Sequence, residues 1–389
     1  MSHPVGSALI YIPSGVNPAA IFTGRTLLER AAALAHAAGL EPVVVDARPG
    51  DRARAVGGLG LAPGSPLPAA GPVMLLRCDA GCVAGVLRDL ASRAEPCVVR
   101  DDAGRAALVR TSAAALGGAL PADLEAAAAG IVAAPRAGWL GQRRIVALGF
   151  ATTGLDPGAV DSARARAERE LLATLDNPRD GFVDGLVNRH LSRPLSHALL
   201  PFPVTPNQVT VFALLLALAG AACLALPGVA APVFGALLLQ VTAILDCVDG
   251  EIARAKVLES EWGEWLDITS DTLIHVATFL GIAVHAWPQL GGGTAWLLGT
   301  LFTVGGLASF VVVTRAEKTE ARWLGSPAWE SRLLAGLLAT LTTRDTSVLV
   351  LAAAATGLLT PLLVGAAFGA QAFWAGTLVL HTRAMRRAA

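Results

Sequence analysis

The chain has 389 residues, of which 54% are hydrophobic and 15% are charged, and its mean hydropathy of +0.57 is too high for an ordinary soluble protein. Lys and Arg together number 30 and so do Asp and Glu, so the chain lacks the basic excess of a nucleic-acid-binding protein. The five cysteines are odd in number and two lie in apolar runs, which argues against a secreted disulfide framework and predicts reduced thiols.

Residues 1–175 alternate short apolar runs with Ala-rich helical stretches. The first 25 residues show no basic segment followed by an apolar core and a cleavage site, so we expect no removable signal peptide and an amino terminus in the cytosol. Between turn signals, strands are predicted at residues 8–12, 42–46, 73–77, 97–100, 107–110 and 144–148, and helices at 27–38 and 156–175. This pattern predicts a layered α/β domain in the cytosol.

Residues 176–207 connect this domain to the apolar half of the chain. They begin with Asn-Pro-Arg-Asp-Gly at 177–181, a typical chain break. Residues 181–200 then combine regularly spaced apolar side chains with basic ones, namely Phe182, Leu186, Leu191 and Leu195 with Arg189, His190 and Arg193. The pattern suits an amphipathic helix along the membrane interface, and a plain connecting helix is an equal alternative.

From residue 208 to residue 389, apolar runs of about membrane-spanning length recur. We place six spans near residues 209–230, 231–249, 268–287, 293–314, 346–359 and 362–382, of which the fifth is short. Lys and Arg follow span 2, lie between spans 4 and 5, or close the chain, and the other three connections have none. We therefore predict a multi-pass integral membrane protein with an all-α six-helix transmembrane domain and both termini in the cytosol.

Four aspartates lie between the second and third spans. Asp246 and Asp249 are three residues apart and Asp267 and Asp271 are four apart, so each pair projects from one face of its helix. Two antiparallel helices can bring all four carboxylates together, where they repel unless a cation neutralises them. Oxygen ligands favour Mg²⁺ or Mn²⁺. A solvated acidic loop is the alternative, and the flanking apolar spans argue against it.

Glycine and arginine residues accompany the aspartates. Gly250 and Gly263 remove side chains on either side of the connection, so that backbone can come close to a ligand. Arg254 offers a planar fork for a phosphate. A diphosphate fits such a pocket, which we expect on the cytosolic side.

The full motif then resembles the signature of a known family. The spacing Asp246-x2-Asp249-Gly250-x2-Ala253-Arg254-x8-Gly263-x3-Asp267-x3-Asp271 matches all eight signature positions of the CDP-alcohol phosphotransferases, also called CDP-alcohol phosphatidyltransferases. The segments at 205–210, Thr-Pro-Asn-Gln-Val-Thr, and at 180–184 also resemble the family's approach to its first transmembrane helix. The resemblance covers roughly residues 177–389.

The resemblance implies six transmembrane helices, a homodimer and a transfer reaction. It implies two metal ions, Mg²⁺ or Mn²⁺, held by Asp246, Asp249, Asp267 and Asp271, and a CDP moiety held by Asn207, Gly250, Ala253, Arg254 and Gly263. In the implied reaction an acceptor hydroxyl attacks the β-phosphorus of a CDP-alcohol, CMP leaves and a phosphodiester forms, with Asp271 as the general base.

The substrates stay open at this point. The donor is CDP-diacylglycerol or a soluble CDP-polyol, since both present the same cytidine diphosphate to the motif. An anionic acceptor would be held by arginines at the cytosolic ends of the spans, and the available residues are Arg189, Arg315, Arg332 and Arg344.

Residues 1–175 resemble the sugar-phosphate nucleotidyltransferases more loosely. The likeness lies in Thr23-Gly-Arg-Thr-Leu-Leu-Glu-Arg30 and in residues 37–45, which match that family's first helix and second strand. Its triphosphate-cradling Gly-rich loop is not intact, because residues 13–20 contain one glycine and no lysine precedes Lys256. Asp79 falls where a metal-binding aspartate would lie, although a strand-end turn residue is the commoner explanation.

We therefore expect a degenerate, non-catalytic first domain. Such a fusion is similar to archaeal and bacterial enzymes that make CDP-inositol and condense it with inositol phosphate or a lipid, which favours polyol or inositol chemistry.

Three other functions fit parts of this pattern. A membrane transporter with an intramembrane acidic site does not explain the Gly and Arg spacing. An Mg²⁺-dependent membrane prenyltransferase does not require Ala253, Arg254 and Gly263. A non-catalytic nucleotide-binding module is opposed by the complete set of aspartates.

Overall fold

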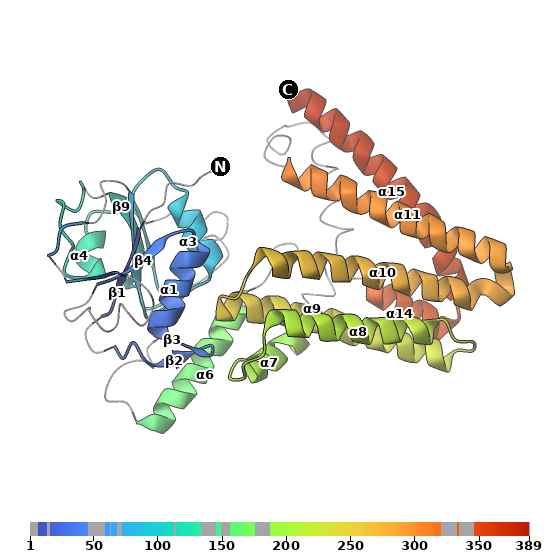
Figure 1. Ribbon diagram of the computed structural model, residues 1–389, viewed down its shortest axis with the longest axis horizontal. Coiled ribbons are helices and arrows are strands. Elements are labelled where there is room, and N and C mark those ends of the chain that lie inside the picture. The colour runs from blue at the N-terminus through green and yellow to red at the C-terminus, as the bar shows by residue number, and fades with distance from the viewer. Residues whose placement is uncertain are drawn as a thin grey trace. The chain divides into compact units, whose positions relative to one another are not determined.

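The computed structural model describes residues 7–13, 16–45, 59–62, 64–67, 72–112, 114–133, 145–148, 156–175, 187–319, 333 and 346–388. The chain divides into two compact units, labelled by element in Figure 1. The first unit comprises Met1–Asp176, Arg193–Thr205 and Gly250–Glu259. The second comprises Asn177–Ser192, Pro206–Asp249 and Ser260–Ala389.

The first unit is built on a six-stranded sheet with the order β5-β4-β1-β6-β9-β8. Its strands are β1 (Ser7–Tyr11), β4 (Glu41–Val45), β5 (Leu59–Leu61), β6 (Pro72–Arg77), β8 (Cys97–Arg100) and β9 (Ala106–Ser112). The strands β5, β4, β1 and β6 are parallel, and β9 pairs antiparallel with β6 and β8. Two short pairs accompany the sheet, β2 (Ile21–Phe22) with β3 (Arg25–Thr26) and β7 (Ala80–Gly81) with β10 (Val146–Ala147).

Helices cover both faces of this sheet. On β1, Ala8 and Ile10 point into one hydrophobic cluster and Leu9 and Tyr11 into another, as the two-residue period of a strand requires. The helices α1 (Leu27–Ala37) and α3 (Ala84–Ala91) lie on one face, and α4 (Leu124–Ala128) lies on the other (Figure 1). The helix α6 (Pro157–Ala173) adds buried leucines to the first cluster. The predicted α/β domain is confirmed, and the strand predicted at 144–148 is reduced to β10.

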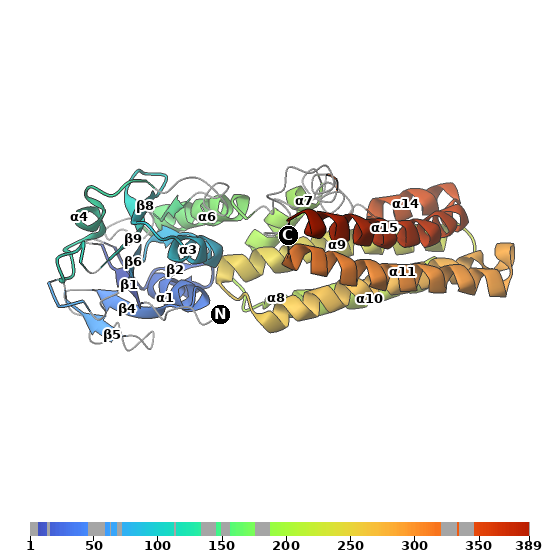
Figure 2. The ribbon, with the colours of Figure 1, turned by 90° about the horizontal axis from the view of Figure 1, so that it is seen from above.

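The second unit is helical. Its elements are α8 (Pro206–Leu224), the first part of α9 (Ala230–Lys256), α10 (Glu261–Leu290), α11 (Gly292–Lys318), α14 (Thr346–Thr356) and α15 (Leu359–Ala388). The long helices run side by side (Figure 2), and α10 packs on α8, α11 and α15. The helix α7 (Arg189–Leu199) precedes them.

Five helices within the described residues, α8, α9, α10, α11 and α15, are long and apolar enough to cross a membrane by length and composition. The fifth predicted span coincides with α14, which has only 11 residues and follows a segment outside the described residues. Six spans therefore stay a prediction. Apolar side chains such as Leu215, Leu297 and Val311 are exposed on the long helices, as expected for surfaces that face lipid.

Small residues bring α8 close to the two helices that carry the aspartates. A methyl group at Gly220 of α8 would meet the carbonyl oxygen of Gly235 on α9 at 2.8 Å, and one at Gly281 of α10 would overlap the carbonyl oxygen of Ala221. Close backbone approach of this kind is typical of packed membrane helices. It holds both α9 and α10 against α8.

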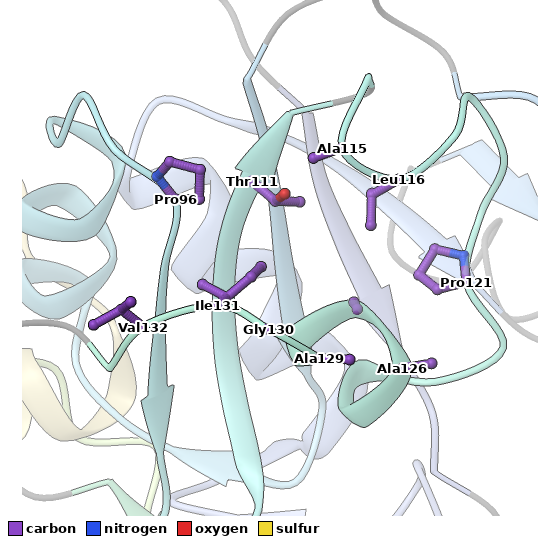
Figure 3. A pocket seen from close by; sticks show the side chains of 11 residues that line it. Pro96, Thr111, Ala115, Leu116, Pro121, Ala126, Ala129, Gly130, Ile131 and Val132 are labelled. Atoms are coloured by element: carbon purple, nitrogen blue, oxygen red, sulfur yellow. The ribbon is translucent and has the colours of Figure 1, made fainter.

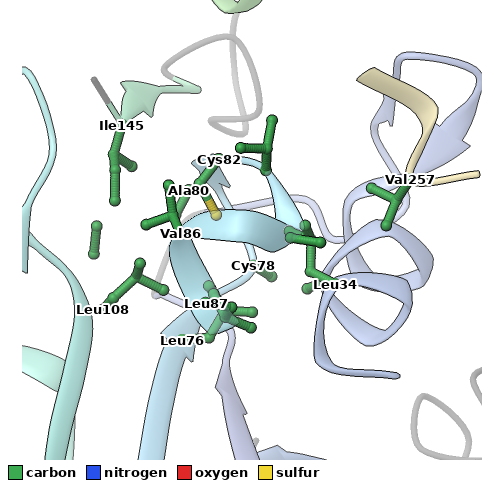
Figure 4. Close-up of a cluster of buried hydrophobic side chains, with 14 of the residues drawn as sticks. Leu34, Leu76, Cys78, Ala80, Cys82, Val86, Leu87, Leu108, Ile145 and Val257 are labelled. Carbon is green, nitrogen blue, oxygen red and sulfur yellow. The ribbon is translucent and has the colours of Figure 1, made fainter. Parts of the chain in front are cut away.

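The connection after α9 is anchored in the first unit. The helix ends with a hydrogen bond of 2.8 Å from the Leu258 N–H to the carbonyl of Ala253, and Val257 takes the left-handed conformation with φ of +55°. Glycine usually holds this position, and here the valine side chain is buried instead. Val257 and Ala255 belong to the same hydrophobic cluster as Leu34 and Leu87 of α1 and α3 (Figure 4). The first domain therefore holds the end of α9, the helix that carries the motif from Asp246 to Arg254.

Candidate active site

Three of the four aspartates converge. Asp246 projects from α9, Asp267 and Asp271 project from α10, and one carboxylate oxygen from each lies within 4.8 Å of the other two. All three residues are half-buried. A hard cation with oxygen ligands fits such a group, because it can contact all three carboxylates and remove their mutual repulsion.

Asp249, one turn after Asp246, is held by a neighbouring helix. Its side chain is 6% exposed, and its Oδ2 accepts a hydrogen bond of 2.6 Å from the hydroxyl of Thr210 on α8. A short bond from a hydroxyl to a carboxylate is among the stronger hydrogen bonds in proteins. Thr210 therefore fixes the Asp249 carboxylate, which is not among the three that converge, and sequence reasoning did not assign Thr210 a role.

Gly250 and Arg254 form a single arrangement on α9. A methyl group at Gly250 would lie 3.2 Å from both Nη atoms of Arg254, so the guanidinium rests where a side chain would otherwise be. The residues are one helical turn apart, which places them on the same face. The glycine thus makes room for the arginine, and the fork of donors stays at one position along the helix.

Gly263 has a comparable role at the start of α10. Ser260 caps this helix, and its Oγ accepts a 3.0 Å hydrogen bond from the Gly263 N–H. A methyl group at Gly263 would lie 3.1 Å from that Oγ and 3.2 Å from Oδ1 of Asn207. Asn207 at the start of α8 and the start of α10 are therefore adjacent, as expected if both contact one ligand.

A small cavity adjoins the aspartates within the second unit. It has a volume of about 80 Å³, and its lining includes Asp246 and Asp271. The other lining residues are Leu239, Thr242, Ala243, Ile274, His275, Thr278, Thr346, Ser347 and Val350. Hydroxyl groups and one imidazole thus line the space next to the carboxylates. His275 lies one turn after Asp271 on α10, a spacing that could have singled it out from the sequence.

The remaining predicted residues are more scattered. Ala253 is half-buried on α9. Arg189 on α7 is 4% exposed, and Arg315 is exposed near the end of α11. Arg332 and Arg344 lie outside the described residues.

In the first unit, Asp79 is enclosed by arginine. It is 1% exposed, and Nε and Nη2 of Arg77 donate to its two oxygens at 2.8 and 2.9 Å. Nη2 also donates to Asp101 at 3.1 Å. Burial by itself would lower the pKa of Arg77, but the hydrogen bonds and charges of Asp79 and Asp101 raise it above its ordinary value. Asp79 is thus neutralised by a permanently charged partner and not presented to a metal.

The first unit also contains a cavity of about 540 Å³ beside α4 and β9 (Figure 3). Its walls are mainly alanine, proline and aliphatic side chains, and Thr111 is the only polar side chain among them. Such a lining offers no group for acid–base or metal chemistry.

The helical half of the chain is similar to known proteins. A model of the CDP-alcohol phosphatidyltransferase family matches residues 203–381. The chain is 35% identical over 125 residues to the bifunctional IPC transferase and DIPP synthase of Aquifex aeolicus, which covers 31% of this chain and 28% of that protein. It is 31% identical over 135 residues to an uncharacterized protein of the same organism, covering 35% and 67%. It is 32% identical over 111 residues to the archaetidylinositol phosphate synthase of Pyrococcus horikoshii, covering 28% and 54%. The match thus spans little more than a quarter of the bifunctional relative.

Proposed function

Because the chain belongs to the CDP-alcohol phosphatidyltransferase family, we propose that it transfers a phosphorylated alcohol from a CDP-alcohol to a hydroxyl acceptor and releases CMP. The observation that carries this proposal is the convergence of Asp246, Asp267 and Asp271 from two helices. Gly250 and Arg254 stand on the same helix as Asp246. Transport does not explain this spacing of glycine and arginine, and prenyl transfer does not require it.

The four aspartates are proposed to hold two divalent cations, Mg²⁺ or Mn²⁺. The three converging carboxylates fit oxygen-ligated cations, and Asp249 is fixed by Thr210 one turn from Asp246. Cations bound there supply positive charge against the diphosphate of the donor.

The protein side chains then have separate tasks. Arg254 binds phosphate oxygens through its planar fork, and Asn207, Gly250, Ala253 and Gly263 surround the cytidine diphosphate. Asp271 accepts the proton of the acceptor hydroxyl. The acceptor oxygen forms a bond to the β-phosphorus, the bond from that phosphorus to the bridging oxygen breaks, and CMP leaves with the electron pair. Asp271 lines the cavity next to Asp246, where an acceptor hydroxyl has room.

The substrate class proposed is inositol or a related polyol. The names of the relatives support it, since one is an IPC transferase and DIPP synthase and another an archaetidylinositol phosphate synthase. The hydroxyls of Thr242, Thr278 and Ser347 beside the carboxylates also suit a polyol. The donor is CDP-diacylglycerol or a CDP-polyol, and an anionic acceptor is held by Arg189, Arg315 or Arg332.

We propose that the domain of residues 1–175 does not catalyse nucleotidyl transfer and serves as a scaffold. The bidentate pairing of Asp79 with Arg77 supports the absence of catalysis, because it occupies both carboxylate oxygens. The burial of Val257 supports the scaffold role, because it anchors the connection between the two halves of the motif.

The membrane arrangement proposed for residues 208–389 is six spans in a homodimer, with both termini and the aspartates on the cytosolic side. Residues 176–207 form the interfacial segment. The apolar side chains of Val187, just before α7, and of Leu191 and Leu195 on α7 are exposed, while Arg189 and Ser192 are buried, which suits a helix with its apolar face toward lipid.

The test is a matrix of donors and acceptors with the detergent-purified full chain. CDP-diacylglycerol and CDP-inositol are each paired with inositol, inositol phosphate, glycerol phosphate and serine, and CMP and the phosphodiester product are quantified. The proposal expects CMP and product in equal amounts with an inositol-type acceptor. CMP formed only with glycerol phosphate or serine would refute the substrate class, and CMP from no pair would refute the reaction.

A further inference from the structure

A second cavity lies in the first unit around the turn of the β2–β3 hairpin. Its volume is about 250 Å³, and its walls are residues 23–25 of the hairpin, residues 201–205 after α7, and Lys256 and Leu258 at the end of α9. The lining contains no aspartate or glutamate. It shares no residue with the cavity beside Asp246 and Asp271.

Two cationic residues, Arg25 and Lys256, line this cavity, and no acidic residue is part of its lining. Within the described part of the chain, neither Arg25 nor Lys256 forms an ion pair. Lys256 is 5% exposed, and its Nζ donates to the carbonyl oxygens of Phe202 at 2.6 Å and Val204 at 3.1 Å. An ammonium group has three N–H donors, so one remains. A buried cation beside carbonyl dipoles alone is costly and favours binding of an anion.

The acidic residue closest in sequence to Arg25 is committed elsewhere. Glu29 accepts hydrogen bonds from the backbone N–H of Thr26 at 3.0 Å and from its hydroxyl at 2.8 Å, and so closes the capping box of α1. These two bonds are the main reason that the pKa of Glu29 is lowered, and Arg25 contributes least.

The turn itself carries a buried hydroxyl. Thr23 is fully buried, and its Oγ1 makes no hydrogen bond within the described residues. Its φ is +52° and that of Gly24 is +81°, a two-residue turn that normally takes Asn-Gly. A β-branched residue in this conformation is strained and persists only where its surroundings hold it, here through a 3.2 Å bond from the Thr23 N–H to Glu168. Thr23 is also one of the residues that line the cavity.

We propose that this cavity is a binding site for a phosphate group, held by the guanidinium of Arg25, the remaining N–H of Lys256 and the hydroxyl of Thr23. A hydroxyl, an ammonium and a guanidinium are the donors that protein phosphate sites use. The phosphate belongs to a free phosphorylated small molecule or to a lipid headgroup. Residues 201–205 immediately precede the candidate span α8, and Lys256 ends the candidate span α9. At the end of a membrane span, both a lipid headgroup and a water-soluble phosphate can enter the cavity.

An anion bound in this cavity has a structural consequence for α9. Lys256 lies two residues after Arg254 on this helix, so an anion bound to Lys256 fixes the end of the helix that carries the motif. The site does not depend on the transfer reaction, and its test can succeed or fail separately from it.

The experiment titrates the full chain in detergent with inorganic phosphate by calorimetry. EDTA is present, so that no divalent cation links phosphate to the aspartates. The wild-type chain is expected to bind phosphate saturably. Thr23→Val and Arg25→Gln are expected to weaken binding about tenfold each, the effect of losing one hydrogen bond to a charged group. Thr23→Ser keeps the hydroxyl and retains affinity, and Arg166→Gln on the exposed face of α6 is the control for charge.

A second arm separates the two sources. The titration is repeated in nanodiscs of phosphatidylcholine and in nanodiscs that also contain phosphatidic acid. Weaker phosphate binding only with phosphatidic acid assigns the site to a lipid headgroup, and equal binding in both assigns it to a free phosphate. The proposal is overturned if phosphate does not bind saturably, or if Thr23→Val and Arg25→Gln bind it as the wild type does.

Discussion

The guanidinium of Arg254 rests against the α-carbon of Gly250, where an added methyl group would lie 3.2 Å from both Nη atoms. The contact explains why a glycine and an arginine stand four residues apart in the motif. The glycine is required for space, since its backbone is an ordinary part of α9. Its absent side chain leaves the space on α9 that the guanidinium occupies.

Gly250→Ala is therefore expected to impair donor binding without weakening the fold. The methyl group displaces the mobile end of Arg254, and kcat/KM for the CDP donor falls about ten- to a hundredfold, as for loss of a charge-assisted hydrogen bond. Alanine favours a helix by about 0.5–1 kcal/mol over glycine, so thermal stability should not fall. Gly376→Ala, where a methyl group meets nothing within 4 Å, is the matched control. Unchanged kinetics in Gly250→Ala would show that the contact has no role.

Thr210→Val is expected to raise the concentration of metal ion needed for activity. The substitution keeps the shape of the side chain but removes the hydroxyl that donates to Asp249 at 2.6 Å. Loss of a partner that orients a metal ligand typically weakens metal affinity about tenfold or more. The measurement is the Mn²⁺ concentration for half-maximal CMP release. Thr210→Ser restores the donor and should behave as the wild type, and an equal defect in both variants would point to packing instead.

Asp79→Asn is expected to lower the free energy of unfolding and to leave the transferase activity unchanged. Removing one charge from the buried pair with Arg77 leaves the guanidinium partly uncompensated, a loss of roughly 3 kcal/mol. CMP release at a temperature where the variant stays folded should match the wild type. Pyrophosphate release from CTP and a phosphorylated alcohol should be absent in both proteins. Pyrophosphate formed by the wild type and lost in the variant would make the first domain an enzyme.

The first domain should also lose stability in alkaline solution through Cys82. Burial raises the pKa of this thiol from 9.0 to about 11, an effect that the nearby Arg30 opposes. The unfolded chain therefore releases this proton first, and the free energy of unfolding falls as the pH rises from 9.0 to about 11. Arg30, whose pKa burial lowers from 12.5 to about 10, acts in the opposite direction from about pH 10 upward and so overlaps the upper part of this window. The thermal midpoints of wild type and Cys82→Ala across this window isolate the thiol, and parallel curves would contradict the prediction.

Sequence periodicity predicted most of the helices and strands, because burial of one face of an element determines where its apolar residues recur. The strand at β1 and the helix at α1 follow from alternating and helical apolar spacing, and α8 to α11 follow from the length of their apolar runs. The end of α9 could not be predicted. Helices commonly stop at glycine, but here Val257 takes the left-handed conformation because its side chain is buried in a domain distant in sequence.

The candidate site could also be predicted from the sequence only in part. Helical spacing predicted that Asp246, Asp267 and Asp271 would face one another, and the structure brings them together. It did not single out Thr210, because a hydroxyl one turn after Pro206 is common in membrane helices and gains meaning only from Asp249 on another helix. The contribution of α14 to the cavity lining also could not be predicted from the sequence, because it depends on packing between helices that are distant in sequence.

The metal site of the transferase is tested by CMP release from CDP-inositol or CDP-diacylglycerol by the purified chain, measured with Mn²⁺ or Mg²⁺ and with EDTA. The variant Asp267→Ala is measured in parallel, and its thermal midpoint shows that it is folded. If these aspartates hold the catalytic metal, the wild type releases CMP only with a divalent cation, and both EDTA and Asp267→Ala abolish the release. CMP release that persists in EDTA or in the folded variant would contradict the assignment of the aspartates as the metal site of the transferase.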